Sequence, residues 1–406
     1  MLSKKEDAIN FHRMLKGKIE IQSRISPERV FEDEIGEVLG LIYTPNVSFV
    51  AAEIANNKEQ AYDYTSKWNN VAIVCDGSRV LSLGNIGAEG AIPVIEGKSV
   101  LFKTLAGINA FPLCISTQNK EEIVKLVKDI EPIFGAINIE DIESPKVLEI
   151  VERLQKELSI PVFHDDQHGT AVIVLAALLN SLQLIKKKIS DVKIVIAGAG
   201  SAGYGIFKIL DAARFKDIIV TDSRGAIYEG RDREPGNKED LYKREIAQKT
   251  NQQRMRGSLS EIIKEADVFV GVSGRGKIIT RQMIQSMNKD AIVFALSNPE
   301  PEIYPELAMA AGARVVATGR SGFANQVNNA VVFPSVLRAL LDLKVKTLAE
   351  NMLVAVAHAI AGIVDEAHIS ERYIIPEVND PRVLPVVVNT IKESIKTHIR
   401  HDTVAR

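Results

Sequence analysis

The sequence predicts an α/β protein with two domains, and three observations support this. The chain has 406 residues, more than one hydrophobic core usually serves. Short apolar runs alternate with amphipathic segments, the pattern of parallel strands joined by helices. A glycine-rich turn follows one of these runs near residue 198. We expect a substrate- and metal-binding α/β domain over residues 1–165, and a doubly wound parallel sheet with a C-terminal helical tail over residues 166–406.

Composition narrows the class of protein. Hydrophobic residues make up 46% of the chain and charged residues 25%, as in ordinary globular proteins. The net charge of −2 gives no indication of nucleic-acid binding. The charged N-terminus does not resemble a secretory signal, and the longest uncharged apolar run, 171–179, is too short to cross a bilayer. Cys75 and Cys114 lie in apolar runs. We therefore expect a cytoplasmic protein without nucleic-acid or membrane partners.

Two pairs of acids follow apolar runs and suggest a metal site. Asp165 and Asp166 lie in VFHDDQHGTA, and Glu140 and Asp141 end the run IFGAINI. Carboxylate oxygens are the ligands that Mg²⁺ and Mn²⁺ prefer. Neighbours in a strand point to opposite faces, so Glu140 and Asp141 can share one ion only beyond the strand end. The alternative is that Asp165 or Asp166 merely caps the following helix.

The region before these acids contains a lysine that could face the same site. Residues 84–107 hold five glycines, which indicates close approach of the backbone to a ligand or another segment. Lys98 and Lys103 lie within it, and on a helix they diverge by about 140°. Only one can face a given site, and we favour Lys98. Upstream, two apolar runs joined by Asp-Gly-Ser at 76–78 predict a β-hairpin.

The second half begins with a dinucleotide-binding pattern. The strand-like run DVKIVIA leads into G-A-G-S-A-G and then a helix, so that a pyrophosphate can approach the helix N-terminus. Asp222 ends the next strand, where an acid accepts hydrogen bonds from the adenosine ribose. This favours NAD, although Arg224 and Arg231 keep NADP possible. The candidate cofactor-binding residues are Gly198, Gly200, Ser201, Ala202, Gly203 and Asp222.

Three further polar side chains occur at element ends. Asn298 follows the run AIVFALS and could hydrogen-bond a substrate. By spacing alone, Asn328 reads as a helix cap, and Tyr43, before a Thr-Pro turn, reads as structural.

These pieces, in this order, resemble the malic enzyme family in its short bacterial and archaeal form. The matching motifs are IYTP, SRVLSLGNIG, EGKSVLFK, NIED, VFHDDQHGTA, IAGAGSAG, ALSNP and NQVNN. The resemblance implies oxidation of L-malate with NAD or NADP and its decarboxylation to pyruvate, with Mg²⁺ or Mn²⁺. It also implies a homodimer.

The resemblance assigns roles residue by residue. It implies that Lys98 is the general base, Asp165 its orienting partner, and Tyr43 the acid that protonates the enol. A lysine in this role needs a lowered pKa. The implied metal ligands are Glu140, Asp141 and Asp166, and the implied substrate-binding residues are Arg79, Asn298 and Asn328. For Tyr43 and Asn328 these roles replace the structural and helix-capping interpretations that spacing alone suggested.

Three alternatives stay open. A malolactic enzyme would use the same residues, retain NAD and release lactate. A different metal-dependent β-decarboxylating dehydrogenase would need the DDQHGTA stretch to be coincidental. A dinucleotide-binding sensor would bind NAD without turnover.

Overall fold

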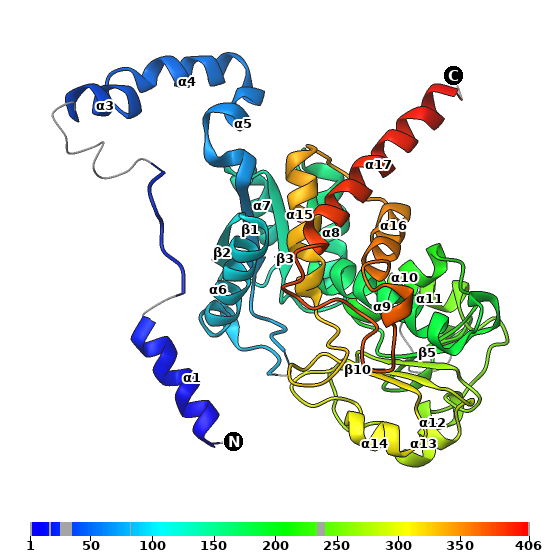
Figure 1. Ribbon diagram of the computed structural model, residues 1–406. Coiled ribbons are helices and arrows are strands. Elements are labelled where there is room, and N and C mark those ends of the chain that lie inside the picture. Colours follow the sequence, from blue (N-terminus) through cyan, green and yellow to red (C-terminus); the bar gives the residue numbers. More distant parts are fainter. Residues whose placement is uncertain (1, 16–17, 25–34, 82, 234–239, 405–406) are drawn as a thin grey trace.

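Two β-sheets and the helices around them form the body of the protein, as the computed structural model in Figure 1 shows. Among the described residues, the first sheet is parallel, and the second is parallel except for one antiparallel pair at its edge. The structure describes residues 2–15, 18–24, 35–81, 83–233 and 240–404. Both sheets have helices on their faces, as parallel sheets require. This confirms the predicted α/β fold class.

The first sheet is parallel and, within the described chain, has the strand order β2-β1-β3-β4. Every residue of β1 and β3 is buried, because helices cover both faces. The strands are β1 (Asn70–Cys75), β2 (Asn109–Cys114), β3 (Ala136–Glu140) and β4 (Val162–His164). The connecting helices are α6 (Gly87–Ala106), α7 (Lys120–Ile130) and α8 (Lys146–Glu157).

The predicted hairpin at residues 76–78 is wrong. Strand β1 is flanked on both sides by parallel partners, β2 and β3, so no neighbouring position is left for a returning strand. The turn itself is present: Gly77 has φ +68°, and a Cβ there would lie 2.0 Å from the Gly87 carbonyl oxygen. The turn therefore folds the chain back onto the start of α6. The second apolar run forms a loop with one isolated bridge, Val80 to Gly84.

The second sheet, in the part of the chain described, has the order β10-β9-β8-β5-β6-β7. Its first strand, β5, lies in the interior, with β6 on one side and β8 on the other, so the winding direction changes beside β5. Dinucleotides bind at such a position. The strands are β5 (Lys193–Ala197), β6 (Asp217–Asp222), β7 (Gly225–Ala226), β8 (Val268–Gly271), β9 (Ile292–Ala295) and β10 (Val315–Thr318). The helices around them are α10 (Ser201–Ala212), α11 (Leu241–Lys249), α12 (Leu259–Ile262), α13 (Arg281–Gln285) and α14 (Pro305–Ala310).

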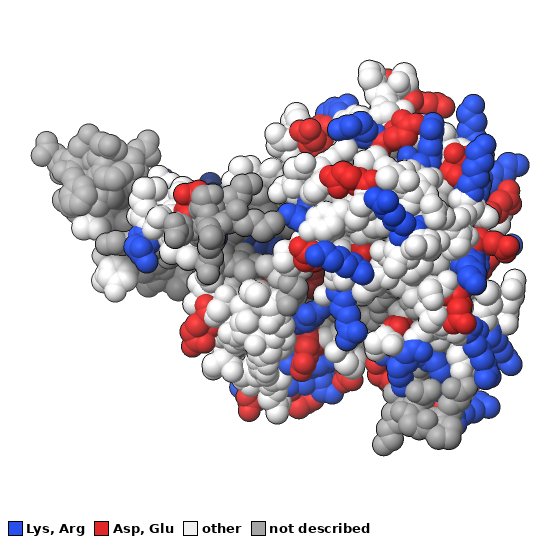
Figure 2. Space-filling model, turned by 90° about the horizontal axis from the view of Figure 1, so that it is seen from below, with Lys and Arg blue, Asp and Glu red and all other residues white. Residues whose placement is uncertain are grey.

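Three of the described N-terminal helices lie apart from the two sheets. They are α1 (Leu2–Leu15), α3 (Ile35–Ile42) and α4 (Val47–Asn56). The α-helix after them, α5 (Ala61–Tyr64), contacts the segment that leads into β1. Figure 1 shows α3 and α4 beyond one end of the body. Large apolar side chains in α3 and α4 are exposed, including Leu41 and Phe49. The face of the body seen in Figure 2, by contrast, carries interspersed charges of both signs.

A buried helix and the C-terminal helices join the two sheets. Helix α9 (Thr170–Ile185) continues directly from a π-helical turn, η4 (Asp165–Gly169), and packs against α10 and α16. Helix α15 contacts α6 and β3 of the first sheet. The C-terminal helices are α15 (Phe333–Asp342), α16 (Glu350–Ala361) and α17 (Val383–Val404). The shorter helices are η1 (Lys58–Gln60), η2 (Ser66–Asn69), η3 (Glu131–Ile133), η5 (Ile189–Asp191), η6 (Arg231–Arg233), η7 (Asn329–Val331) and η8 (Glu366–His368).

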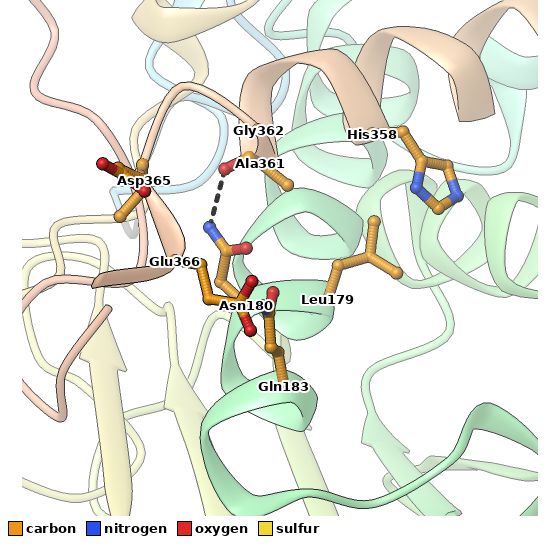
Figure 3. A pocket seen from close by; sticks show the side chains of 9 residues that line it. Leu179, Asn180, Gln183, His358, Ala361, Gly362, Asp365 and Glu366 are labelled. Carbon is orange, nitrogen blue, oxygen red and sulfur yellow. Dashed lines mark hydrogen bonds between the residues drawn. The ribbon is translucent and has the colours of Figure 1, made fainter. Parts of the chain in front are cut away.

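By length and apolar composition, residues 165–185 could cross a membrane, but most of this segment is buried inside the protein. Beside it, a cavity of about 490 Å³ lies between α9 and α16 (Figure 3). Asn180 lines this cavity, and its amide donates to the carbonyl oxygens of Ala361 and Ile374, each at 3.0 Å. This side chain therefore ties α9 to the C-terminal segment.

The close contact between α10 and η4 gives a test of this packing. A Cβ at Gly205 would lie 2.1 Å from the Gln167 carbonyl oxygen. We expect Gly205→Ala to lower the free energy of unfolding by about 1–3 kcal/mol, because the clash outweighs the helix propensity of alanine. Urea unfolding measures this. The control is Gly200→Ala, since a Cβ there meets no atom within 4 Å; equal stability of both variants would contradict the packing.

Candidate active site

The two pairs of acids meet at one edge of the first sheet. Strand β3 ends at Glu140 and β4 ends at His164, and these strands are parallel neighbours. The carboxyl ends of parallel neighbours lie side by side. Asp141 has φ +49°, so the backbone turns immediately after Glu140. The backbone turn that Glu140 and Asp141 would need in order to share one ion is therefore present.

Lys98 projects from α6 into this group of acids. Its Nζ lies 2.5 Å from Glu140 Oε1 and 2.6 Å from Asp165 Oδ2, and both carboxylates are buried. The same ammonium lies 4.6 Å from the centre of the Phe333 ring in α15. Lys103 is directed elsewhere and donates to Asn109 Oδ1 at 2.9 Å. Lys98 is thus the lysine of this helix that the fold places among the carboxylates.

The charges of the site affect one another strongly. Burial opposes the charged form of Lys98, but Asp165 and Glu140 outweigh it and raise its pKa above the ordinary value. The sequence-based requirement of a lowered pKa is therefore not met in this arrangement. Burial raises the pKa of Glu140, Asp165 and Asp166. Burial, together with Glu140 and Asp166, raises the pKa of Asp141 to about 8. Four carboxyl groups thus lie close to one ammonium, and the repulsion among them disfavours their all being ionised at once.

The carboxylate oxygens at this site are of the type that binds a hard divalent cation. In the described part of the chain, Asp141 Oδ2 and Asp165 Oδ1 are buried and have no hydrogen-bond partner. Such oxygens are the ligands that Mg²⁺ and Mn²⁺ take. Among the described residues, however, no three acidic, histidine or cysteine side chains converge as a finished coordination shell. Carboxylate oxygens that could bind a cation are therefore present, and Lys98 lies between those of Glu140 and Asp165.

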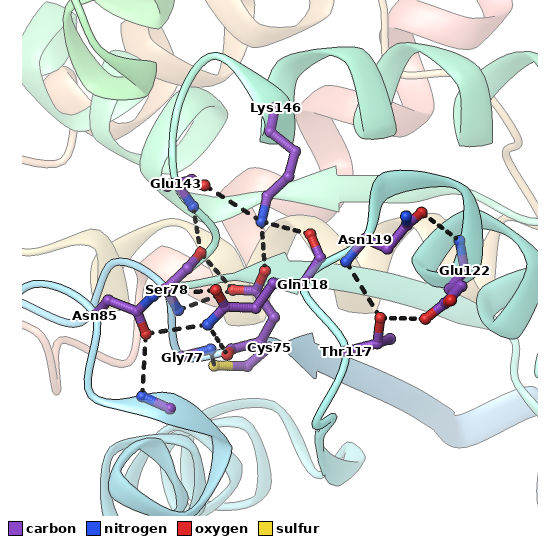
Figure 4. Close-up of polar contacts among 12 residues, drawn as sticks. Cys75, Gly77, Ser78, Asn85, Thr117, Gln118, Asn119, Glu122, Glu143 and Lys146 are labelled. Atoms are coloured by element: carbon purple, nitrogen blue, oxygen red, sulfur yellow. Dashed lines mark hydrogen bonds and ion pairs between the residues drawn. The ribbon is translucent and has the colours of Figure 1, made fainter.

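Arg79 reaches the site from the loop after β1. A network of polar contacts fixes this loop (Figure 4). The Asp76 carboxylate accepts from Ser78 N at 2.9 Å and from Lys146 Nζ at 2.8 Å. Arg79 N donates to the Asp141 carbonyl at 3.1 Å, and the Arg79 charge acts on Asp166. A Cβ at Gly274 would lie 2.3 Å from Arg79 Nη2, so the guanidinium borders both sheets.

Of the asparagines, Asn329, which the sequence suggested only as a helix cap, makes the direct contact. Asn329 donates to Asp165 Oδ2 at 3.3 Å and accepts from Thr170 Oγ1 at 3.2 Å. Asn328 accepts from Ala330 N at 2.9 Å and caps η7, as its spacing suggested. Asn298 follows β9 and is half-buried. In the sequence, the only indication of the role of Asn329 was that it follows Asn328 directly and precedes an apolar helix.

Tyr43 is not brought to this site within one chain. It directly follows α3 and is 72% exposed. Figure 1 shows α3 apart from α6 and β3, which carry Lys98 and Glu140. The single chain therefore assembles the acids, Lys98 and Arg79, and leaves Tyr43 outside.

The glycine-rich turn forms a compact passage from β5 into α10. Gly198 has φ +124°, and a Cβ at Gly203 would lie 1.9 Å from the Gly198 carbonyl oxygen. Gly200 faces open space, and α10 begins at Ser201. The first N–H groups of a helix have no partner within the helix, so they can bind a pyrophosphate. The small side chain of Ala202 leaves room for such a group here. The turn fits a dinucleotide, and Asp222 ends the adjacent strand β6.

Together, the fold and the site are those of a dinucleotide-binding enzyme with a cluster of buried acids around one lysine. Comparison with known proteins then gives the family. The family description "Malic enzyme, N-terminal domain" matches residues 20–125, and "Malic enzyme, NAD binding domain" matches residues 167–393. The chain belongs to the malic enzyme family.

Individual relatives agree with this assignment. The chain is 46% identical to the bifunctional malic/malolactic enzyme of Bacillus subtilis, over 99% of this chain and 96% of that protein. It is 48% identical to the NAD-dependent malic enzyme of Geobacillus stearothermophilus, over 93% and 76%. The crystal structure of NAD-dependent malic enzyme from Thermotoga maritima superposes with a TM-score of 0.88 at 45% identity, covering 95% of this chain and 98% of that one.

The electrostatics of Asp141 predict how stability varies with pH. Its pKa of about 8 in the folded state exceeds the unfolded value of ~3.9, so its contribution is full below pH ~4 and is lost as the pH rises towards 8. As the pH is raised from 5 to 8 in a chelator, we expect the Asp141→Asn variant to become more stable relative to the wild type, by about 3–4 kcal/mol, since each pH unit between the two pKa values contributes about 1.4 kcal/mol. Urea unfolding at both pH values measures this, and parallel pH profiles would refute it.

Proposed function

We propose that this enzyme oxidises and decarboxylates L-malate to pyruvate and CO₂, with reduction of NAD or NADP and with Mg²⁺ or Mn²⁺ bound. The observation that carries the proposal is Lys98, held between Glu140 and Asp165 at the edge where the acids meet. Family membership and the dinucleotide-binding turn support it. We place the enzyme in the cytoplasm, where its two cysteines would stay free thiols.

The acids would hold the cation. Glu140, Asp141 and Asp166 supply carboxylate oxygens at one sheet edge, two of them on consecutive residues across a backbone turn. When bound, the cation polarises the substrate hydroxyl and stabilises negative charge on oxygen. In the protein it would also favour the ionised forms of the buried carboxyl groups, whose pKa values are raised by burial.

Lys98 is the proposed base for the C2 hydroxyl of malate. A base must arrive neutral, whereas Asp165 and Glu140 favour the ammonium in the present arrangement. When these carboxylates are protonated or bind a cation, their negative charge is offset and the pKa of Lys98 falls. Nζ can then be neutral and accept the hydroxyl proton. Asp165, which also accepts from Asn329, then keeps Lys98 in position.

The remaining residues orient the substrate and complete the reaction. Arg79 would pair with a malate carboxylate, and Asn298 and Asn328 would hydrogen-bond the substrate. Hydride passes from C2 to the nicotinamide, for which the second sheet supplies the binding position. The ketone formed at C2 draws electrons from the bond to the departing CO₂, and Tyr43 gives its proton to C3.

Tyr43 would have to act on a second copy of the chain. In one chain it is exposed, on a segment that also exposes Leu41, Phe49 and other apolar side chains. Apolar surface of this kind marks an interaction site. A homodimer in which each N-terminal segment lies on its partner would cover this surface and supply Tyr43 to the partner's site.

The malolactic reaction is the second candidate, because one relative is named for both activities. The test follows reduced-nicotinamide absorbance with L-malate and Mn²⁺, while pyruvate and lactate are assayed. Pyruvate equal to the nicotinamide reduced supports the proposal. Lactate without net reduction would favour the malolactic reaction, and cofactor binding without either product would favour a sensor.

Removal of the base should abolish most of the activity. We expect Lys98→Met to lower kcat by about 10²–10⁴-fold, the usual contribution of general acid–base catalysis. Cofactor binding, measured by fluorescence of the reduced nicotinamide, should be retained. Lys103→Met, on the same helix but bonded to Asn109, is the matched control. Equal losses in both variants would argue against Lys98 as the base.

Mixed dimers test whether Tyr43 acts on the partner. Tyr43→Phe and Lys98→Met chains, each inactive alone, are refolded together. A mixed dimer then holds one intact site if Tyr43 crosses over, so activity should recover to about one quarter of the wild-type value. If Tyr43 serves its own chain, every site carries a defect and no activity returns.

A further inference from the structure

The carboxylate of Asp222 already has a full set of hydrogen bonds. Oδ1 accepts from Arg224 N at 2.9 Å and from Arg231 Nη1 at 3.1 Å. Oδ2 accepts from Arg231 Nη2 at 2.8 Å and from Lys243 Nζ at 3.1 Å. A carboxylate offers about four lone-pair sites, and here all four are used.

This occupancy changes what Asp222 can do at the end of β6. An acid at this position selects NAD by accepting hydrogen bonds from the ribose hydroxyls. Asp222 instead serves as an acceptor for the protein itself, with its side chain 9% exposed. A ribose hydroxyl could bond it only by displacing one of the protein donors, two of which come from the buried, bidentate Arg231.

Among the described residues that contact the Asp222 carboxylate, the partly exposed side chains are those of Lys243 and Arg224, and both are hydrogen-bond donors. Arg231 alone balances the charge of the carboxylate, and Lys243 adds a second positive charge from α11. The side chains of Lys243 and Arg224 are 24% and 37% exposed, and Arg224 Nη2 lies 3.7 Å from Asp222 Oδ2. Ammonium and guanidinium groups at a strand end are suited to a phosphate rather than to a hydroxyl.

We propose that the ribose end of the cofactor site takes a 2′-phosphate, that Lys243 contacts this phosphate, and that NADP therefore binds more tightly than NAD. The proposal deepens the function proposed above and rests on it only for the use of a nicotinamide cofactor. It differs from the expectation drawn from sequence, where an acid at position 222 favoured NAD. The difference arises because Arg231 and Lys243 come from segments that fold back onto β6.

The experiment titrates the intact protein with two fragments of the cofactors, adenosine 2′,5′-bisphosphate and adenosine 5′-monophosphate, by calorimetry. The pair differs only in the 2′-phosphate. We expect the bisphosphate to bind at least about tenfold more tightly, and Lys243→Gln to remove about tenfold of that affinity without weakening the monophosphate. The matched control is Lys249→Gln, on the same helix but paired with Asp211 and Glu245. Thermal unfolding confirms that both variants are folded.

Three outcomes would overturn the proposal. They are equal or tighter binding of the monophosphate, equal losses in the Lys243 and Lys249 variants, and no binding of either fragment. Malate takes no part in these titrations. A protein that prefers the bisphosphate but fails to oxidise malate would therefore refute the proposed function and leave this inference intact.

Discussion

The short contacts of Lys98 with two buried carboxylates are the interaction on which the site depends. Burying an unpaired charge is costly, so Glu140 and Asp165 could not both lie at this sheet edge as anions without a cation between them. The same pairing holds Lys98 in its charged form. The protonation state of Lys98 therefore depends on the charge of these acids. Any cation that offsets the charge of Glu140 and Asp165 also lowers the pKa of Lys98 and favours the neutral amine that proton transfer needs.

This arrangement draws on segments far apart in the sequence. Lys98 comes from α6, Glu140 from β3, Asp165 from η4, and Phe333 and Asn329 from the segment after the second sheet. Because η4 continues into α9 and contacts α10, the start of the dinucleotide-binding helix is mechanically joined to the acids. The acids and the dinucleotide-binding helix are thus neighbours through the contact of η4 with α10, as hydride transfer between substrate and cofactor would require.

Much of the fold could be predicted from the sequence, because apolar runs, glycine-rich turns and acids at strand ends are local signals. The hairpin failed because strand pairing is not local: β1 uses both edges for parallel neighbours. Asn329 was missed because asparagine serves equally well as a helix cap and as a hydrogen-bond donor to a buried carboxylate such as Asp165. The state of Asp222 depends on Arg231 and Lys243, and the position of Tyr43 on a whole segment. Neither could be read from residue spacing.

The most direct test of the central claim is chemical rescue of Lys98→Ala by small primary amines, with L-malate oxidation followed at saturating cofactor and Mn²⁺. If Lys98 is the base, a free amine in the vacated space restores turnover, and the rate rises with amine concentration and with amine basicity. If substrate and cofactor still bind but no amine raises the rate, Lys98 is only a structural counter-ion and the proposed mechanism is wrong.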